Sequence, residues 1–221
     1  MTQTTESVLA GVLSTDRVSF RRLYAFNYRP ADYVHATRRP LFADGQIAEA
    51  IWSEERARNH LSTYILREME LEQKPCLDVA RWEWKLVLLD GERLTRLARH
   101  IGGALLGPYA RRSVVREEVL RWRERLTEEV YQFVVTSASL LRVVESTEQM
   151  DPTLPVETIG YGWIQACLAS APIELQARAQ LKFPVDVSTT SVPPESARQF
   201  VISVLSALEP TWCSSFVTTR Q

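Results

Sequence analysis

Apolar residues recur every three or four positions across residues 115–146, the strongest periodic pattern in the chain. The stripe includes Val119, Leu126, Val130 and Phe133. This spacing places the side chains on one face of an α-helix. At 1.5 Å per residue, a single helix over this range would be roughly 45 Å long. The chain is therefore expected to fold around one long helix.

Shorter helical patterns surround this long one. They cover 44–72 (one long or two shorter helices), 79–89, 92–101, 158–170 and a last helix that begins at Pro194 and ends at Pro210. The pairs Gly102-Gly103 and Gly107-Pro108 are expected to form the connection to the long helix. Alternating apolar residues allow one short strand at 180–187, which Pro184 would confine to a sheet edge. The predicted fold is mainly α: a single compact multi-helix domain with a short β element near 180–187.

The composition is that of a soluble globular protein. The chain is 45% hydrophobic and 24% charged with a net charge of -1, a balance that argues against a dedicated nucleic-acid binder. Its N-terminal residues carry no basic start followed by an apolar run, so a secretory signal is not expected. Cys76, Cys167 and Cys213 are odd in number and widely spaced, as is typical of reduced thiols. These features predict a cytoplasmic protein.

The sequence was tested against the common catalytic and metal-binding patterns. His35, His60 and His100 stand alone, without a second ligand at metal-site spacing. Gly102 and Gly107 have the glycine spacing of a phosphate-binding loop, but Pro108 replaces the lysine that it requires. Paired glutamates lie off the apolar stripes and are typical of solvated helix faces. We therefore predict no catalytic, cofactor-binding or metal-binding residue. A helical enzyme with an active site assembled by the fold remains the alternative.

Arginine is concentrated between residues 93 and 125. Two interpretations stay open: an electropositive surface that binds an acidic partner, or a solvated face balanced by glutamates such as Glu117 and Glu118. A regulatory nucleic-acid-binding protein that uses the arginine face is a further alternative. Six tryptophans are present, of which Trp82, Trp122 and Trp163 fall on inward stripes and are expected in the core. The other three flank the stripes, and two interpretations stay open for them: burial in the core or partial exposure as interface anchors. The residues expected at a protein interface are Arg111, Arg112, Arg116, Arg123, Trp52, Trp84 and Trp212.

Several short motifs, in order along the chain, resemble one protein family. The phrase Tyr28-Arg29-Pro30-Ala31-Asp32-Tyr33-Val34-His35 comes first, and on a helix it would allow Asp32 to pair with His35. The segment 86–92, the segment Leu181-Lys182-Phe183-Pro184 and the ending 210–216 follow. Together they are similar to the SctK (YscK/PscK-like) family, component K of the type III secretion sorting platform of Gram-negative bacteria.

The resemblance implies a non-enzymatic cytoplasmic adaptor without a cofactor. Family members link the cytoplasmic domain of the inner-membrane ring protein SctD to the pod protein SctQ, and through SctQ they hold SctL and the secretion ATPase. The implied protein binds no nucleic acid and reaches the cytoplasmic face of the inner membrane only through its partners. Residues 1–18 are expected to be a flexible N-terminal segment and 19–221 the helical adaptor domain.

Overall fold

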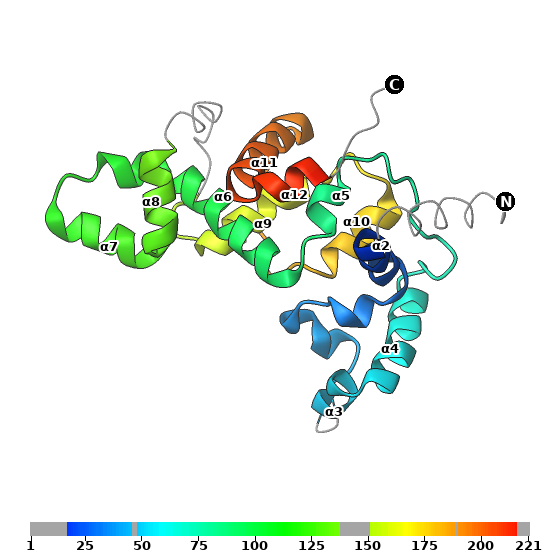
Figure 1. The fold of residues 1–221 in the computed structure, drawn as a ribbon. Coiled ribbons are helices and arrows are strands. Elements are labelled where there is room, and N and C mark those ends of the chain that lie inside the picture. The colour runs from blue at the N-terminus through cyan, green and yellow to red at the C-terminus, as the bar shows by residue number, and fades with distance from the viewer. Residues whose placement is uncertain (1–16, 46–47, 138–150, 189, 216–221) are drawn as a thin grey trace. The chain divides into compact units, whose positions relative to one another are not determined.

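The computed structural model describes residues 17–45, 48–137, 151–188 and 190–215 (Figure 1). Within these ranges the chain forms helices and turns and no strand, so the prediction of a mainly α-helical fold is confirmed. The short strand allowed at 180–187 does not form: helix α10 (Ile173–Gln180) ends there, and 181–187 form a turn and irregular backbone. None of the described helices is long and apolar enough to cross a membrane.

The described residues pack into two compact units. Unit 1 contains the chain up to Gly91 together with a return segment, 171–185. Unit 2 contains Glu92–Ser170 and the described residues from Asp186 onward. Of the N-terminal segment expected to be flexible, residues 1–16 lie outside the described part, and Arg17 and Val18 begin the first described helix. The division into 1–18 and 19–221 stays a prediction.

Unit 1 is made of short helices. In chain order they are α2 (Arg17–Tyr28), η1 (Pro30–Asp32), η2 (Ala36–Leu41), α3 (Ala48–Ser53), α4 (Glu55–Glu68), α5 (Trp84–Val87) and α10. Region 44–72 thus contains two helices, and region 79–89 contains only the single turn of α5, shorter than expected. Its core includes the buried residues Val34, Leu61, Ile65 and Leu181.

Unit 2 contains longer helices. They are α6 (Gly91–Arg112), α7 (Arg116–Leu126), α8 (Glu128–Thr136), α9 (Val156–Cys167), α11 (Pro194–Leu208) and α12 (Pro210–Ser215). Helices α9 and α11 pack together, and the Trp163 ring meets the edge of the Phe200 ring with centroids 5.2 Å apart. Both helices match the sequence prediction closely. Pro210, expected only to end α11, also begins α12, where its missing N–H costs nothing.

Helix α6 continues through the residues that were expected to interrupt it. Its 22 residues include Gly102, Gly107 and Pro108. At Gly102 a Cβ would overlap the backbone carbonyl of Val156 at the start of α9. The glycine is therefore explained by the close approach of two helices rather than by a turn. The expected break at 102–108 was wrong because glycine marks a crossing here.

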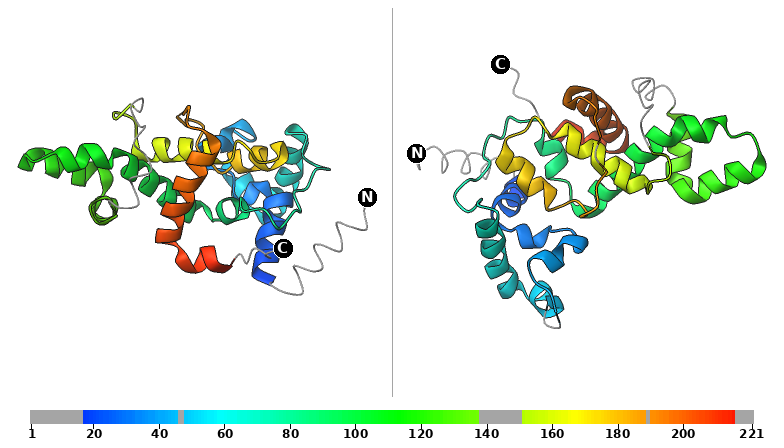
Figure 2. Two further views of the ribbon diagram at one scale, coloured as in Figure 1. Left: turned by 90° about the horizontal axis from the view of Figure 1, so that it is seen from above. Right: turned by 180° about the vertical axis from the view of Figure 1, so that it is seen from behind.

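The long helix expected over 115–146 is also divided. Thr127, with φ 64° and ψ 156°, separates α7 from α8, and residues 138–150 lie outside the described part. The apolar stripe is nonetheless used, because Leu126, Val130 and Val134 are buried around Gly103 of α6. The break lets α7 and α8 place these three residues against α6. Helices α7 and α8 consequently lie side by side at one end of unit 2 (Figures 1 and 2).

Candidate protein-binding surface

The arginine-rich region lies where α6 ends and α7 begins. Residues 113–115 connect the two helices. Side chains of both helices and of this connection line a groove of about 500 Å³. We call it the α6–α7 groove. Its lining consists of Tyr109, Arg112, Ser113, Glu118, Arg121, Trp122 and Arg125. All of these residues belong to unit 2.

One wall of the groove is held in place by hydrogen bonds. The indole N–H of Trp122 donates to the Ser113 hydroxyl at 3.1 Å, and that hydroxyl donates to the Tyr109 carbonyl at 3.3 Å. The Arg125 guanidinium lies 5.2 Å from the centre of the Trp122 ring and donates to the carbonyls of Pro152 and Leu154. Trp122, expected in the core, is only half-buried because one side of its ring lines this groove.

The four arginines expected at an interface have different surroundings. Arg123 forms two hydrogen bonds to the Glu128 carboxylate, at 2.9 and 2.7 Å, which lower the pKa of Glu128 to about 2. Arg111 donates to the Val134 carbonyl at 3.2 Å. Arg112 lines the groove, and Arg116 is exposed in the first turn of α7. The structure therefore places Arg112 at the groove, leaves Arg116 exposed on α7 outside the groove lining, and ties Arg111 and Arg123 to α8.

Three arginines at the end of α6 and on α7 have no hydrogen-bond or ion-pair partner among the described residues. The guanidinium groups of Arg112, Arg116 and Arg121 make no hydrogen bond or ion pair with the part of the chain that the structure describes. Exposed aliphatic side chains adjoin them: Val114 is 90% exposed and Leu120 50%. Arginine combined with aromatic and aliphatic side chains is typical of protein interfaces, because its planar group can bind a carboxylate through two hydrogen bonds. The α6–α7 groove is therefore the candidate binding surface.

The tryptophans expected as partly exposed anchors are placed differently. Trp52 and Trp84 are buried in unit 1, with 6% and 2% exposure, so the expectation of exposure was wrong for both. The Trp84 indole donates to the Asp78 carbonyl at 2.6 Å, and the Arg39 guanidinium covers the Trp52 ring at 5.1 Å. Trp212 is half-buried in α12, and its role in binding stays a prediction.

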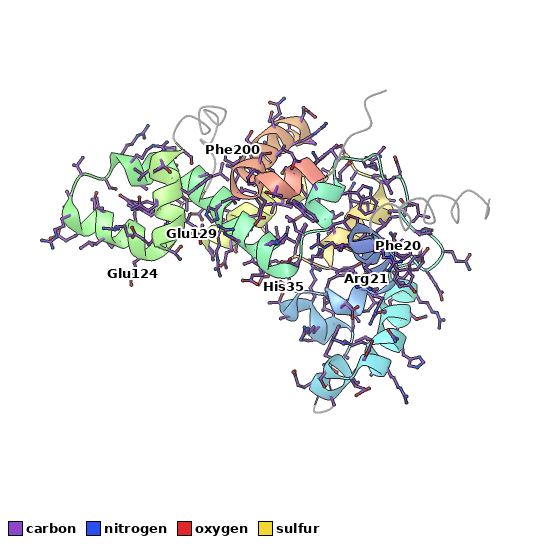
Figure 3. The ribbon with its side chains drawn as sticks, in the orientation of Figure 1. Phe20, Arg21, His35, Glu124, Glu129 and Phe200 are labelled. Atoms are coloured by element: carbon purple, nitrogen blue, oxygen red, sulfur yellow. The ribbon has the colours of Figure 1, made fainter. Side chains whose placement is uncertain are left out.

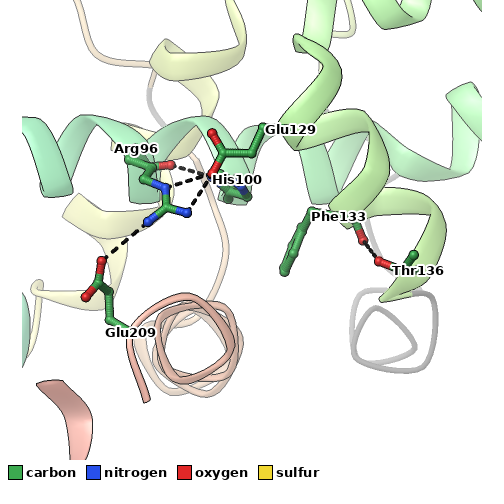
Figure 4. Close-up of polar contacts among 6 residues, drawn as sticks. All are labelled: Arg96, His100, Glu129, Phe133, Thr136 and Glu209. Atoms are coloured by element: carbon green, nitrogen blue, oxygen red, sulfur yellow. Dashed lines mark hydrogen bonds and ion pairs between the residues drawn. The ribbon is translucent and has the colours of Figure 1, made fainter. Parts of the chain in front are cut away.

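The enzyme alternative depends on a histidine beside a carboxylate or thiol in a cleft. His100 comes nearest, because its Nε2 lies 3.7 Å from Glu129 Oε1 (Figure 4). That carboxylate is already bound by Arg96 at 2.6 Å, which lowers its pKa, while Arg96 also approaches Glu209 at 3.5 Å. The His100 Nδ1–H donates to the Arg96 carbonyl at 2.8 Å, and burial lowers the pKa of this imidazole. This network joins α6 to α8 and to Glu209, which follows α11.

No metal-ligand cluster is evident among residues whose placement is described. Within those ranges no group of three His, Cys, Asp or Glu side chains is arranged to hold a metal ion. His60 is exposed on α4. His35 accepts a hydrogen bond at Nδ1 from the Thr37 amide at 3.3 Å, and Asp32 pairs with Arg29 at 2.8 Å. The pairing of Asp32 with His35 that the sequence suggested does not form, because η1 is a single 3-10 turn that ends between them.

Three of the family-like segments meet inside unit 1. The His35 amide donates to the Leu181 carbonyl at 2.8 Å, and the Lys182 ammonium donates to the carbonyls of Val87, at 2.7 Å, and Leu89. The same ammonium lies 5.5 Å from the centre of the Tyr33 ring. Segments 28–35, 86–92 and 181–184 therefore form a structural junction.

A second buried cation completes this junction and was missed by sequence reasoning. Arg178 is 1% exposed and donates to the backbone carbonyls of Asn27, Leu71 and Glu174 at 3.4, 2.9 and 3.2 Å. Its position three residues after Leu175 and three before Leu181, both buried, is the signal that could have revealed it. Burial lowers the pKa of Lys182 to about 8.

The comparison with protein families gives one match. A family model described as YOP proteins translocation protein K (YscK) matches residues 22–208, which run from α2 to the end of α11. No curated protein and no solved structure matches the chain. The match covers all three segments of the buried junction and the whole α6–α7 groove.

Proposed function

Because this chain belongs to the YscK family of type III secretion proteins, we propose that it is a non-enzymatic adaptor of the secretion sorting platform. In this role it links the cytoplasmic domain of the inner-membrane ring protein SctD to the pod protein SctQ. Through SctQ it supports SctL and the secretion ATPase, and it works at the cytoplasmic face of the inner membrane. The family match over residues 22–208 is the observation that carries the proposal.

The two units support a bridging role. Each is compact, so each can present a surface to a different partner. Unit 2 offers a groove lined by the Tyr109 and Trp122 rings and by Arg112 and Arg121, which have no partner among the described residues. Aromatic rings combined with arginine are the chemistry of a protein interface. The histidine–carboxylate pair of α6 and α8 is bound into an ion-pair network, which favours an adaptor over an enzyme.

Co-purification from cells with an intact secretion apparatus tests this function. An affinity-tagged full-length chain, expressed from its own locus, should recover the SctQ and SctD homologues of the same cell. Deletion of the gene should stop secretion of type III substrates, and the tagged copy should restore it. Recovery of neither homologue, with secretion unchanged in the deletion strain, would refute the proposal.

A further inference from the structure

We propose that the α6–α7 groove docks an acidic segment of a partner protein, one that carries an apolar side chain between its carboxylates. This inference rests on the adaptor function and specifies the chemistry of one of its contacts. It concerns residues of unit 2 alone, and each step depends on the charge and exposure of the groove lining.

The charge of the groove lining determines which charge the bound segment must carry. Three arginines and one glutamate line the groove, so its lining carries an excess of positive charge. The guanidinium groups of Arg112 and Arg121 have no partner among the described residues, so their hydrogen-bond donors are available. Arg125 is held by backbone carbonyls and keeps its full charge. A carboxylate can bind such a group through two parallel hydrogen bonds, which makes these pairs stronger than neutral ones.

The apolar part of the lining requires an apolar side chain in the occupant. Trp122 is fixed by the Ser113 hydroxyl and by the Arg125 guanidinium, so its ring provides a rigid surface. Tyr109, which is 36% exposed, adds a second aromatic ring to the lining. A cavity of about 500 Å³ has room for a few side chains of an extended or helical segment. Rigid aromatic anchors within polar surroundings are typical of the energetic centre of protein interfaces.

Nucleic acid fits this surface less well than an acidic protein segment. Glu118 lies within the groove, and Glu117 is exposed on the same helix. Glu124, also on α7, is exposed as well (Figure 3). These carboxylates would repel a continuous phosphate backbone, whereas a peptide can place its charges only at the arginines.

Peptide binding to the full-length chain tests the charge argument. The probe is a fluorescein-labelled twelve-residue synthetic peptide of glutamates around one leucine and one phenylalanine; a second peptide replaces every glutamate by glutamine. The triple variant R112E/R116E/R121E should bind the acidic peptide at least about tenfold more weakly, and the glutamine peptide should bind weakly to both proteins. The matched control R17E/R21E/R56E changes three exposed arginines of unit 1 by the same charge and should lose less than about threefold.

A gain of affinity tests the location of the site. Glu118 lines the groove and Glu117, its neighbour on α7, does not. Glu118→Gln should tighten binding of the acidic peptide by about threefold, because it removes the one carboxylate that opposes the peptide, whereas Glu117→Gln should change it less. Circular dichroism and urea unfolding verify that each variant is folded. If the groove has only a structural role, Glu118→Gln should not bind the acidic peptide more tightly.

Three results would overturn the proposal. The first is equal loss of peptide binding in the groove variant and the unit 1 control, which would show non-specific charge attraction. The second is unchanged binding in R112E/R116E/R121E. The third is tighter binding of a labelled twelve-nucleotide single-stranded DNA than of the acidic peptide at the same salt concentration, which would make the groove a nucleic-acid site.

Co-purification separates this inference from the adaptor function. If both are right, the wild-type chain recovers the SctQ and SctD homologues, and R112E/R116E/R121E loses one of them and keeps the other. If the wild type recovers both and the variant also recovers both, the groove inference fails and the function stands. If the wild type recovers neither, the proposed function fails.

Discussion

Two pairs of positively charged side chains, one pair in each unit, have opposite surroundings. In unit 1, Arg178 and Lys182 are buried, with 1% and 7% exposure, and they donate hydrogen bonds to backbone carbonyls. In unit 2, Arg112 and Arg121 face the α6–α7 groove and have no hydrogen-bond or ion-pair partner among the described residues. The contrast distinguishes cations that hold the chain together from cations that remain available to a partner.

Helix length explains why the units differ. The last carbonyls of a helix have no donor within the helix, and they attract positive charge. Unit 1 has many short helices and therefore many such carbonyls: Asn27 lies at the end of α2, Leu71 follows α4, and Val87 ends α5. Arg178 and Lys182 satisfy these groups. The long helix α6 satisfies most of its own carbonyls, so unit 2 does not need buried cations for this purpose.

Removal of the buried arginine should have the largest effect. Arg178→Met leaves the carbonyls of Asn27 and Leu71 without their charged donor, and each such bond contributes about 2 kcal/mol. We expect the free energy of unfolding in urea to fall by about 4 kcal/mol.

The matched control is an arginine of the groove. Arg121→Met removes the same charge from an exposed position and should change the free energy of unfolding by less than about 0.5 kcal/mol. Similar losses in the two variants would contradict the distinction between structural and available arginines.

Unit 2 is held together by close helix crossings, and a crossing glycine should be the next most sensitive position. At Gly160 of α9 a Cβ would overlap the carbonyl group of Ala98 in α6. Gly160→Ala must push the two helices apart, which should lower the free energy of unfolding by about 3 kcal/mol.

Gly91 at the start of α6 provides the comparison, because a Cβ there would meet nothing within 4 Å. Gly91→Ala should be neutral or stabilising by up to about 1 kcal/mol, since alanine restricts the unfolded chain. Urea unfolding followed by tryptophan fluorescence measures both variants. If Gly160→Ala is as stable as Gly91→Ala, close crossings do not hold unit 2 together.

The local patterns of the sequence predicted a helix well where its buried residues form a single apolar face. Helices α9 and α11 were found because their buried residues follow a regular helical spacing. The division at Thr127 and the continuity of α6 could not be found in this way. Both depend on how separate helices approach one another, and glycine in a sequence does not distinguish a turn from a crossing.

The candidate site was predictable only in part. Arg112 and Arg116 were expected at an interface because arginine is concentrated between residues 93 and 125. The groove itself requires α7 to return beside the end of α6, which brings Tyr109 and Ser113 next to Trp122. No local pattern specifies that approach. The burial of Trp52 and Trp84 was missed for a similar reason, because their contacts come from residues distant in the fold or in turns.

Because Lys182 is a buried cation of unit 1, its titration should make the free energy of unfolding depend on pH. Its pKa is about 8 in the folded chain against a usual value of 10.5, because burial disfavours the charged form. Between these values the unfolded chain binds more protons than the folded one, so stability should rise with pH. The Lys182 contribution should add about 2 kcal/mol to the free energy of unfolding between about pH 8 and pH 10.

The variant Lys182→Met isolates this contribution, because every other titrating group is unchanged. Urea unfolding of wild type and variant, measured in half-unit steps of pH, gives the difference in their free energies of unfolding. The difference should move in favour of the wild type by about 2 kcal/mol across this range and stay constant below about pH 7, where the lysine is charged in both states. Neutral Lys182 retains two N–H donors for its two carbonyl partners, so the contacts of the junction persist as the charge is lost. Parallel pH profiles of wild type and variant would show that this lysine is hydrated in the folded chain, and that the junction does not bury its charge.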